Sequence, residues 1–357
     1  MKHNACIITN RKIKTKTVIL TSVCIALAVS FIAASNASIN GAINGLCLCA
    51  DILIPSLFPF CVISTFIIRS DISDFLGKLL HPSGKLLFGI NGNATCAIIL
   101  SMLSGYPVGA KLIGLLYEQN QLSQKQAQNL ICCCVNPGPA FIVLAVGQGI
   151  LNNRQMGYLL LAANTISCII INIIFRSKEP IISQSAVNSL SYSDAFVQSV
   201  SDACTSIIGV CAWVVLFSSV LETTGVFLPQ HIQNILTALS EVTTSTVYLR
   251  KNIMLVAISL GWCGFSVHAQ IMSVCGKIMP NYLKFALIRL LHGLLLAGIT
   301  QLLMKIFSVS LAVSSIADTP VYSGTAASVP AAIALIVTCV IFLASCPKNT
   351  LGKLNNI

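Results

Sequence analysis

The sequence contains few charged residues. Asp, Glu, Lys and Arg together make up 9% of its 357 positions. Soluble domains contain roughly 25% charged residues, which cover the surface that meets water. This chain is instead 55% hydrophobic, with a mean hydropathy of +0.87. A water-soluble fold is therefore excluded, and we expect the chain to lie in a membrane.

Motifs for catalysis and for tight metal binding are also absent. The sequence has no His-Glu-x-x-His, no Gly-x-x-x-x-Gly-Lys-Ser/Thr and no Cys-x-x-Cys. Its 16 cysteines lie almost entirely in apolar runs, where free cysteine behaves as a small hydrophobic side chain. We therefore expect no enzyme activity, no metal site and no cofactor, and we leave a coupling ion (H⁺ or Na⁺) open.

Basic residues outnumber acidic ones by 11, but their distribution does not suggest nucleic-acid binding. Aromatic residues do not alternate with them, as a surface that stacks bases requires. Five basic residues precede the first apolar run, in a terminal segment 1–17: Lys2, Arg11, Lys12, Lys14 and Lys16. Most of the others occur at the ends of apolar stretches. Positive charge beside a span marks the cytoplasmic side, so we expect a cytoplasmic N-terminus.

Long uncharged runs predict an all-α, polytopic membrane protein with about 8–10 membrane segments. A span needs about 20 apolar residues. The runs without Asp, Glu, Lys or Arg are 18–50, 86–110, 126–153, 155–175, 203–221, 252–276 and 319–347. Residues 18–34 form the expected first transmembrane helix. The alternative is a signal peptide cleaved near residue 38; we favour the span.

One segment of the first half is expected to turn back inside the membrane. A span at 43–68 ends near Arg69, and a pair of spans at 128–150 and 156–175 ends at Arg176 and Lys178. Basic residues also flank 86–117 on both sides. If all these ends are cytoplasmic, the segment 86–117 enters and leaves on the same side. Non-helical backbone at membrane depth must be buried in protein or line a cavity. We therefore predict a re-entrant hairpin or broken helix that bends near Gly105.

The sequence of the second half resembles that of the first in a way that predicts an inverted repeat. Gly105-Tyr106-Pro107-Val108-Gly109-Ala110-Lys111 resembles Gly264-Phe265-Ser266-Val267-His268-Ala269-Gln270, and residues 105–134 align without a gap to 264–293. Paired Gly/Pro interruptions of this kind mark binding sites in secondary transporters. The predicted parts are a first repeat at 41–175, a connecting loop at 176–202, a second repeat at 203–346 and a C-terminal tail at 347–357.

Polar residues within apolar runs are candidates for binding a solute or an ion, because burying them in a membrane is costly. They are Asn91, Asn93, Ser104, Tyr106, Asn136, Glu241, Thr243, His268 and Gln270. The alternatives are structural: a kink for packing at Asn136, an interfacial position for Glu241, and a hydrogen bond to a neighbouring helix for His268. Lys111 is expected either to face the gate or to extend to the interface.

Gly and Pro mark the expected hinges or re-entrant breaks. They are Pro55, Pro59, Gly105, Pro107, Gly109, Pro137, Gly138, Pro139 and Gly264. Proline lacks an N–H and frees a carbonyl group, while glycine permits tight backbone bends.

Four strings resemble the family of the sporulation integral membrane protein YlbJ. They are Ile54-Pro55-Ser56-Leu57-Phe58-Pro59-Phe60, Leu103-Ser104-Gly105-Tyr106-Pro107-Val108-Gly109-Ala110-Lys111, Asn136-Pro137-Gly138-Pro139-Ala140-Phe141 and Gly264-Phe265-Ser266-Val267-His268-Ala269-Gln270. The resemblance covers roughly residues 40–310. It implies relation to spore maturation proteins with the nucleoside recognition (gate) domain, and distant kinship with concentrative nucleoside transporters.

The resemblance implies a multi-pass protein of the cell membrane that is needed for the spore cortex. With the paired interruptions, it favours a carrier that moves a small polar solute by alternating access. The alternative is a non-transporting scaffold of the sporulation machinery. We expect the lipid bilayer and a small polar solute as partners, and no nucleic acid. Self-association and other sporulation membrane proteins are left open.

Overall fold

The computed structural model describes residues 15–182 and 190–309. All regular structure in these ranges is helical: α1 (Thr15–Ala33), α2 (Ser35–Leu48), η1 (Cys49–Leu53), α3 (Ile54–Arg69), α4 (Ile72–Ser83), η2 (Gly84–Phe88), α5 (Gly92–Ser104), α6 (Tyr106–Glu118), α7 (Gln124–Cys134), η3 (Phe141–Ile150), α8 (Arg154–Ile174), α9 (Tyr192–Phe227), α10 (Gln230–Ser240), α11 (Val242–Tyr248), α12 (Ile253–Trp262), α13 (Gly264–Cys275), η4 (Gly276–Ile278) and α14 (Tyr282–Ile306). The predicted C-terminal tail, the apolar run 319–347 and most of the basic N-terminal segment lie outside the described residues.

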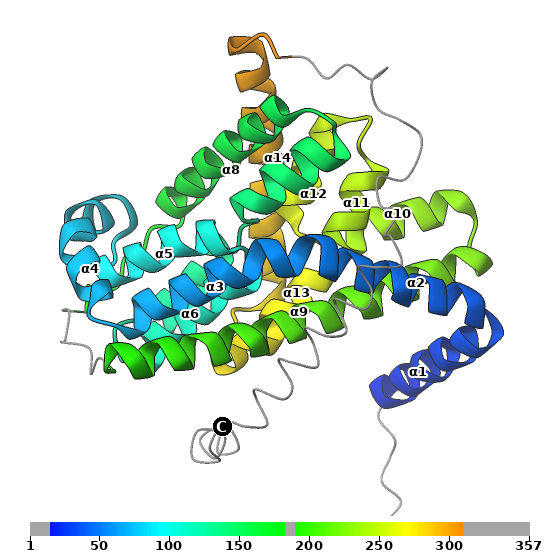
Figure 1. Cartoon of the computed structure of the whole chain (residues 1–357), viewed down its shortest axis with the longest axis horizontal. Coiled ribbons are helices and arrows are strands. Elements are labelled where there is room, and N and C mark those ends of the chain that lie inside the picture. Colours follow the sequence, from blue (N-terminus) through cyan, green and yellow to red (C-terminus); the bar gives the residue numbers. More distant parts are fainter. Residues whose placement is uncertain (1–14, 183–189, 310–357) are drawn as a thin grey trace, which may run out of the picture.

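The expected first transmembrane helix is present as α1. Its side chains from residue 18 to residue 29 are all exposed in the isolated chain, and Figure 1 shows α1 at the edge of the molecule. A helix that is apolar and unburied on every side is suited to contact with lipid. Its apolar part, Val18–Ala33, is shorter than a full span. Cleavage near residue 38 stays an open alternative.

A single helix of 35 residues, Ser35–Arg69, forms one side of the molecule. It includes α2, η1 and α3 and continues through Pro55 and Pro59, so the predicted break at these prolines is wrong. Pro55 lies inside this continuous helix and cannot donate the backbone hydrogen bond of its position. The π-helical turn η1 directly before it accommodates the local change in hydrogen bonding.

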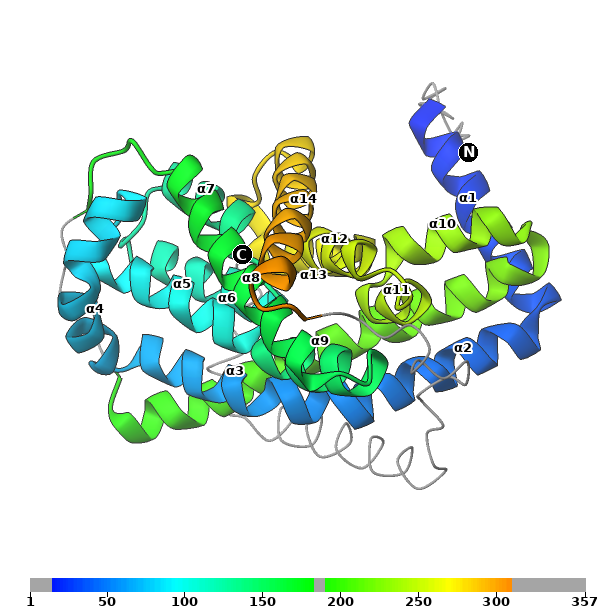
Figure 2. The ribbon, with the colours of Figure 1, turned by 90° about the horizontal axis from the view of Figure 1, so that it is seen from above.

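This long helix packs antiparallel against α9, as Figures 1 and 2 show. A Cβ added to Gly41 would lie 2.6 Å from Ser218 O, and one added to Gly45 would lie 2.8 Å from Val215 Cα. Residue numbers therefore rise along one helix as they fall along the other. Glycine lets the two backbones approach closely, which is how helices associate in lipid.

Helix α9 begins at Tyr192, so the predicted connecting loop 176–202 is too long by 11 residues. Asp194 and Asp202 made this stretch resemble a loop in the sequence. Asp202 is tolerated in a helix because it pairs with two cations, Arg69 at 2.7 Å and Lys111 at 3.1 Å. Pairing of this kind offsets the cost of placing a carboxylate beside apolar segments.

The predicted turn at Gly105 is confirmed. Gly105 has φ +94° and separates α5 from α6. A Cβ added to Gly109 would lie 2.6 Å from Ser101 Cβ, and these residues are each four positions from Gly105. In a straight helix they would be about 12 Å apart. Helices α5 and α6 therefore form a hairpin. A second bend, which the sequence analysis missed, turns the chain by 86° between Phe88 and Gly92.

Apart from α4 and η2, which follow the long helix of the first half and have no counterpart after α9, the two halves repeat the same order of elements. Each has a long helix (Ser35–Arg69 or α9), a hairpin (α5/α6 or α10/α11), a broken helix (α7/η3 or α12/α13) and an unbroken helix (α8 or α14). The long helices are antiparallel, so the hairpins start from opposite ends of the molecule. Figure 1 shows α5 and α6 on one side and α10 and α11 on the other. This arrangement is an inverted repeat.

The repeat has a different register from the one that the sequence suggested. Aligning 105–134 with 264–293 would pair α7 with α14, yet α7 is interrupted after 11 residues and α14 runs unbroken for 25. The element order instead pairs Gly105 with Glu241. The short likeness between the strings is local, because in both a glycine with positive φ starts a helix after a break.

Five helices in the described ranges are long and apolar enough to cross a membrane, or six if the bent pair is one span. They are Ser35–Arg69, Arg154–Ile174, Tyr192–Phe227, Ile253–Ile278 and Tyr282–Ile306. The expected 8–10 segments also counted the broken elements, whose pieces are only 7 to 13 residues long. The class, a polytopic helical membrane protein, is confirmed.

Candidate functional site

The hairpin of the first half meets the broken helix of the same half at a glycine. A Cβ added to Gly138 would lie 3.2 Å from Leu103 O and 3.5 Å from Gly105 N. Gly138 ends the non-helical stretch 135–138 between α7 and η3, which includes Asn136 and Pro137, and helical structure resumes at Pro139. The predicted interruption there is confirmed. The tip of the hairpin is therefore in direct backbone contact with it.

The second half makes the same contact. A Cβ added to Gly264 would lie 2.8 Å from Ser240 O and 3.1 Å from Val242 N. These atoms flank Glu241, the tip of the hairpin α10/α11, where the backbone is extended. Gly264 itself has φ +82° and follows Cys263, at φ +77°. Each half thus contributes one hairpin tip and one helix break, joined through a glycine.

The two halves meet where α12 ends. Its last four carbonyl groups all have hydrogen-bond donors. The pairs are Cys263 N to Ser259 O (2.9 Å), Tyr106 Oη to Leu260 O (3.1 Å), Arg289 Nη2 to Gly261 O (2.5 Å) and His268 Nε2 to Trp262 O (3.0 Å). A helix end inside a membrane requires such partners. Tyr106 supplies one from the first half, so the hairpin tip at Gly105 is tied to the break at Cys263.

His268 serves this cap. A carbonyl oxygen can only accept a hydrogen bond, so the contact with Trp262 O assigns the proton to Nε2. Nδ1 then accepts a hydrogen bond from Tyr282 Oη at 3.3 Å. The ring also packs against Trp262 and Phe285, with centroids 4.5 Å and 4.9 Å away. Of the two sequence interpretations, the hydrogen bond to a neighbouring segment is the one observed.

Arg289 is the residue of this region that the sequence analysis missed. It is fully buried on α14, seven residues and about 10 Å from the start of that helix. Its position contradicts the expectation that basic residues outside the N-terminal segment mark span ends. The available signal was its place within the apolar string Leu287-Ile288-Arg289-Leu290-Leu291. An ionisable residue inside a span is a functional candidate by default.

Several buried polar atoms near the breaks have no hydrogen-bond partner among the described residues. They include Asn136 Oδ1, Thr243 Oγ1, Asn164 Oδ1, His292 Nδ1, and Arg289 Nε and Nη1. Asn136 uses only its amide nitrogen, which lies 3.1 Å from Cys168 Sγ. Unpaired buried polar atoms cost free energy unless water or a ligand satisfies them. Asn136 and Thr243 were predicted contacts; Asn164 and His292 were not.

Glu241 caps the second hairpin and is 2% exposed. Its Oε2 accepts hydrogen bonds from Thr244 N (2.7 Å) and Thr244 Oγ1 (2.9 Å), which fixes the start of α11. Glu241 lies at a helix end, between α10 and α11, as the structural alternative expected, and it is buried there. Glu241 remains a candidate contact at the hairpin tip.

Other predicted contacts lie elsewhere or bond within the fold. Asn91 caps α5 and donates to Gln121 O (2.7 Å), while Asn93 donates to Asp74 Oδ1 (2.8 Å). Both are at the far end of α5, about 20 Å from Gly105. The structure therefore does not bring them to the breaks.

Two predicted contacts near the breaks make mainly local bonds. Ser104 contacts Ser64 Oγ and donates to Leu100 O (2.8 Å), which ties the first hairpin to α3. Gln270 donates to Ser266 Oγ (3.3 Å) on the same helix. Of the predicted hinges, Pro107 lies in the first turn of α6, where proline is well tolerated.

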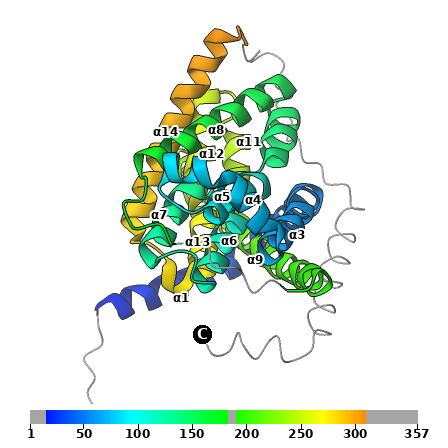
Figure 3. The same ribbon diagram turned by 90° about the vertical axis from the view of Figure 1, so that its left-hand side faces the viewer.

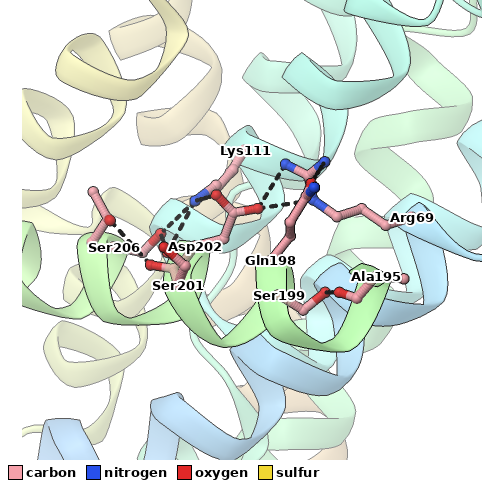
Figure 4. A network of polar contacts seen from close by, with 9 residues as sticks. Arg69, Lys111, Ala195, Gln198, Ser199, Ser201, Asp202 and Ser206 are labelled. Atoms are coloured by element: carbon pink, nitrogen blue, oxygen red, sulfur yellow. Dashed lines mark hydrogen bonds and ion pairs between the residues drawn. The ribbon is translucent and has the colours of Figure 1, made fainter. Parts of the chain in front are cut away.

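Lys111 does not extend freely to an interface. Its Nζ contacts Asp202 Oδ1 (3.1 Å) and Ser206 Oγ (3.2 Å), so it joins the first hairpin to α9. Arg69 approaches the same carboxylate, with Nη2 at 2.7 Å from Oδ2. Figure 4 shows Asp202 between the two cations. This triad connects α3, α6 and α9 beside the hairpin.

Two comparisons with known proteins bear on the fold and site. Residues 51–176 match the family model described as nucleoside recognition (Gate), and these residues run from η1 to just beyond α8. The chain is 27% identical over 341 residues to the sporulation integral membrane protein YlbJ of Bacillus subtilis (strain 168), covering 82% of this chain and 84% of that protein. No solved structure matches. The predicted resemblance to the YlbJ family is thus confirmed, with a nucleoside recognition (Gate) segment in its first half.

Proposed function

We propose that this protein is a carrier that moves a small polar solute across the cell membrane of a spore-forming bacterium by alternating access. The observation that carries the proposal is the doubled contact of a hairpin tip with a broken helix, at Gly138 and at Gly264. In an inverted repeat, such contacts open to opposite sides in turn while the solute stays near the midplane. The similarity to a sporulation protein supports a role in sporulation, and the proposal places that role in formation of the spore cortex.

The fold also supplies a fixed part against which a hairpin can move. Helices α3 and α9 lie together on one side, and α14 and α7 lie on the other, as Figure 3 shows. The first hairpin is held to α3 and α9 by Ser104 and Lys111 and to α12 by Tyr106. Polar contacts of this kind can exchange between two arrangements at lower cost than a close-packed apolar seam. The N-terminus is cytoplasmic in this proposal.

The test is solute flux through Gly138→Leu. The new side chain would press on Leu103 O and Gly105 N and force the hairpin tip away from the break. Gly209→Leu is the matched control, because a Cβ at Gly209 has no neighbour within 4 Å. Metabolite comparison of deletion and wild-type sporulating cells identifies candidate solutes, which are then measured in proteoliposomes.

We expect Gly138→Leu to reduce uptake at least tenfold at normal expression, and Gly209→Leu to leave it unchanged. If neither uptake nor cortex formation changes in Gly138→Leu, the protein is not a carrier of this design. If cortex formation depends instead on the segment 176–191 and no solute is transported, the scaffold alternative is correct.

A further inference from the structure

The guanidinium of Arg289 has more hydrogen-bond donors than its contacts within the fold require. Nη2 donates to Gly261 O (2.5 Å) and lies 3.1 Å from Cys263 Sγ. Nε and Nη1 have no partner among the described residues, although the side chain is fully buried. The ion pairs found in the described part of the chain do not include Arg289. Within the described part of the chain, the guanidinium is therefore a buried cation with no carboxylate at ion-pair distance.

A structural role alone does not account for this arginine. Capping Gly261 O needs one donor, which a neutral glutamine would supply. An unpaired buried charge costs several kcal/mol, and the cost is recovered only when an opposite charge and further hydrogen bonds reach it. Arginine presents its donors as a planar fork that matches carboxylate or phosphate oxygens. The two unused nitrogens thus point to an oxyanion.

The neighbouring groups would complete such a site. His292 is three residues from Arg289 on the same face of α14 and is also fully buried. Ser167 Oγ on α8 donates to Asn164 O (2.9 Å) and lies 2.8 Å from His292 Nε2, so Nε2 donates to it and Nδ1 is left as an acceptor. Neither His292 Nδ1 nor the side-chain Oδ1 of Asn164 has a hydrogen-bond partner among the described residues. These acceptors suit a solute that carries hydroxyl or amino groups as well as an anionic group.

The position of Arg289 ties this site to the gate. Its guanidinium bonds the last turn of α12, and Tyr106 of the first hairpin bonds the adjacent carbonyl, Leu260 O. We propose that Arg289 binds the carboxylate or phosphate of the transported solute, at the point where the two halves meet. The proposal deepens the carrier function and rests on it.

The binding test uses the full chain, purified in dodecyl maltoside, which contains no phosphate. The probes are inorganic phosphate and succinate, added at constant ionic strength against sodium chloride, and the readout is the midpoint of thermal unfolding. Binding to the folded state raises this midpoint. We expect a rise in wild type and in the matched variant Arg154→Gln, whose arginine is exposed at the start of α8. Arg289→Gln should weaken the apparent affinity by ~10-fold or more, because hydrogen bonds to a charged group are lost.

Each result of the binding test decides the proposal. No rise in wild type with either probe overturns it, as does an equal rise in Arg289→Gln. A rise produced only by added phosphatidylglycerol also overturns it, because the ligand would then be a lipid headgroup. If Arg289→Gln does not fold, Arg289→Lys replaces it in the test, because lysine keeps the charge but not the planar fork. We expect this variant to bind the probes measurably, but more weakly than wild type. An affinity equal to that of wild type would overturn the proposal.

Flux measurements separate this proposal from the carrier function. Anion binding that depends on Arg289, in a protein that transports no solute, would support the site and refute the carrier. Transport of a neutral solute that neither probe inhibits, and that Arg289→Gln leaves unchanged, would support the carrier and refute the site.

Discussion

Replacing Gly261 by alanine should separate α12 from α14 and damage the junction between the halves. The added Cβ would lie 2.3 Å from Gly293 Cα and 2.5 Å from Gly293 N, whereas ordinary contacts are 3.4–4 Å. The helices must therefore move apart by about 1 Å to restore an ordinary contact. No side chain can rotate away, because the opposing atoms are backbone.

The expected cost lies at the upper end of the range for overpacking, about 3 kcal/mol. The movement also lengthens the bond from Arg289 Nη2 to Gly261 O, now 2.5 Å. Gly298→Ala is the matched control on α14. Its Cβ would have no neighbour within 4 Å, so the higher helix propensity of alanine should stabilise the protein by up to about 1 kcal/mol.

The measurement is the free energy of unfolding in mixed micelles, followed by circular dichroism as the fraction of denaturing detergent rises. Gly261→Ala should be less stable than Gly298→Ala by about 3–4 kcal/mol, the difference of the two effects. Equal stability of the two variants would show that the backbones of α12 and α14 are not in contact at Gly261, and the account of this junction would fail.

Two further predictions concern polar groups away from α12. Asp202→Asn should destabilise the protein by ~3 kcal/mol, because it leaves Arg69 and Lys111 without a counter-charge. Lys111→Met should cost clearly less, because the ion pair between Arg69 and Asp202 remains complete. The same unfolding assay ranks the two variants, and the reverse order would contradict the account of the triad. Asn91→Ala should lower the free energy of unfolding by about 2 kcal/mol, because it removes the cap of α5 and the donor to Gln121 O. Solute flux through the folded fraction should stay normal. A selective loss of flux would show that Asn91 contacts the solute.

Part of the candidate site was readable from residue types. The breaks at Gly105, at 135–138 and at Gly264 were predicted because Gly and Pro interrupt uncharged runs, and the structure has a break at all three. Asn136 and Thr243 were also identified, since a polar side chain is conspicuous in an apolar run. These signals depend only on residues that are neighbours in the sequence, so they can be identified without knowledge of the fold.

The pairing of breaks could not be predicted in the same way. The string at Gly105 resembles the string at Gly264, yet Gly105 contacts Gly138 and Gly264 contacts the residues that flank Glu241. The similarity of the two strings shows only that both helix starts require a glycine with positive φ. Which break meets which hairpin depends on how the long helices pack, and that is decided by contacts more than 100 residues apart in the chain.

The amino-acid sequence by itself determined the class of the protein, because 9% charged residues cannot cover a water-soluble surface. It also indicated the breaks at Gly105, at Pro137-Gly138 and at Gly264, because glycine and proline favour the backbone conformations of a helix break. The tertiary structure alone decided the register of the repeat, the pairing of Lys111 with Asp202 and the burial of Arg289. These depend on which side chains other helices bring to the same place, which the order of residues along the chain does not show.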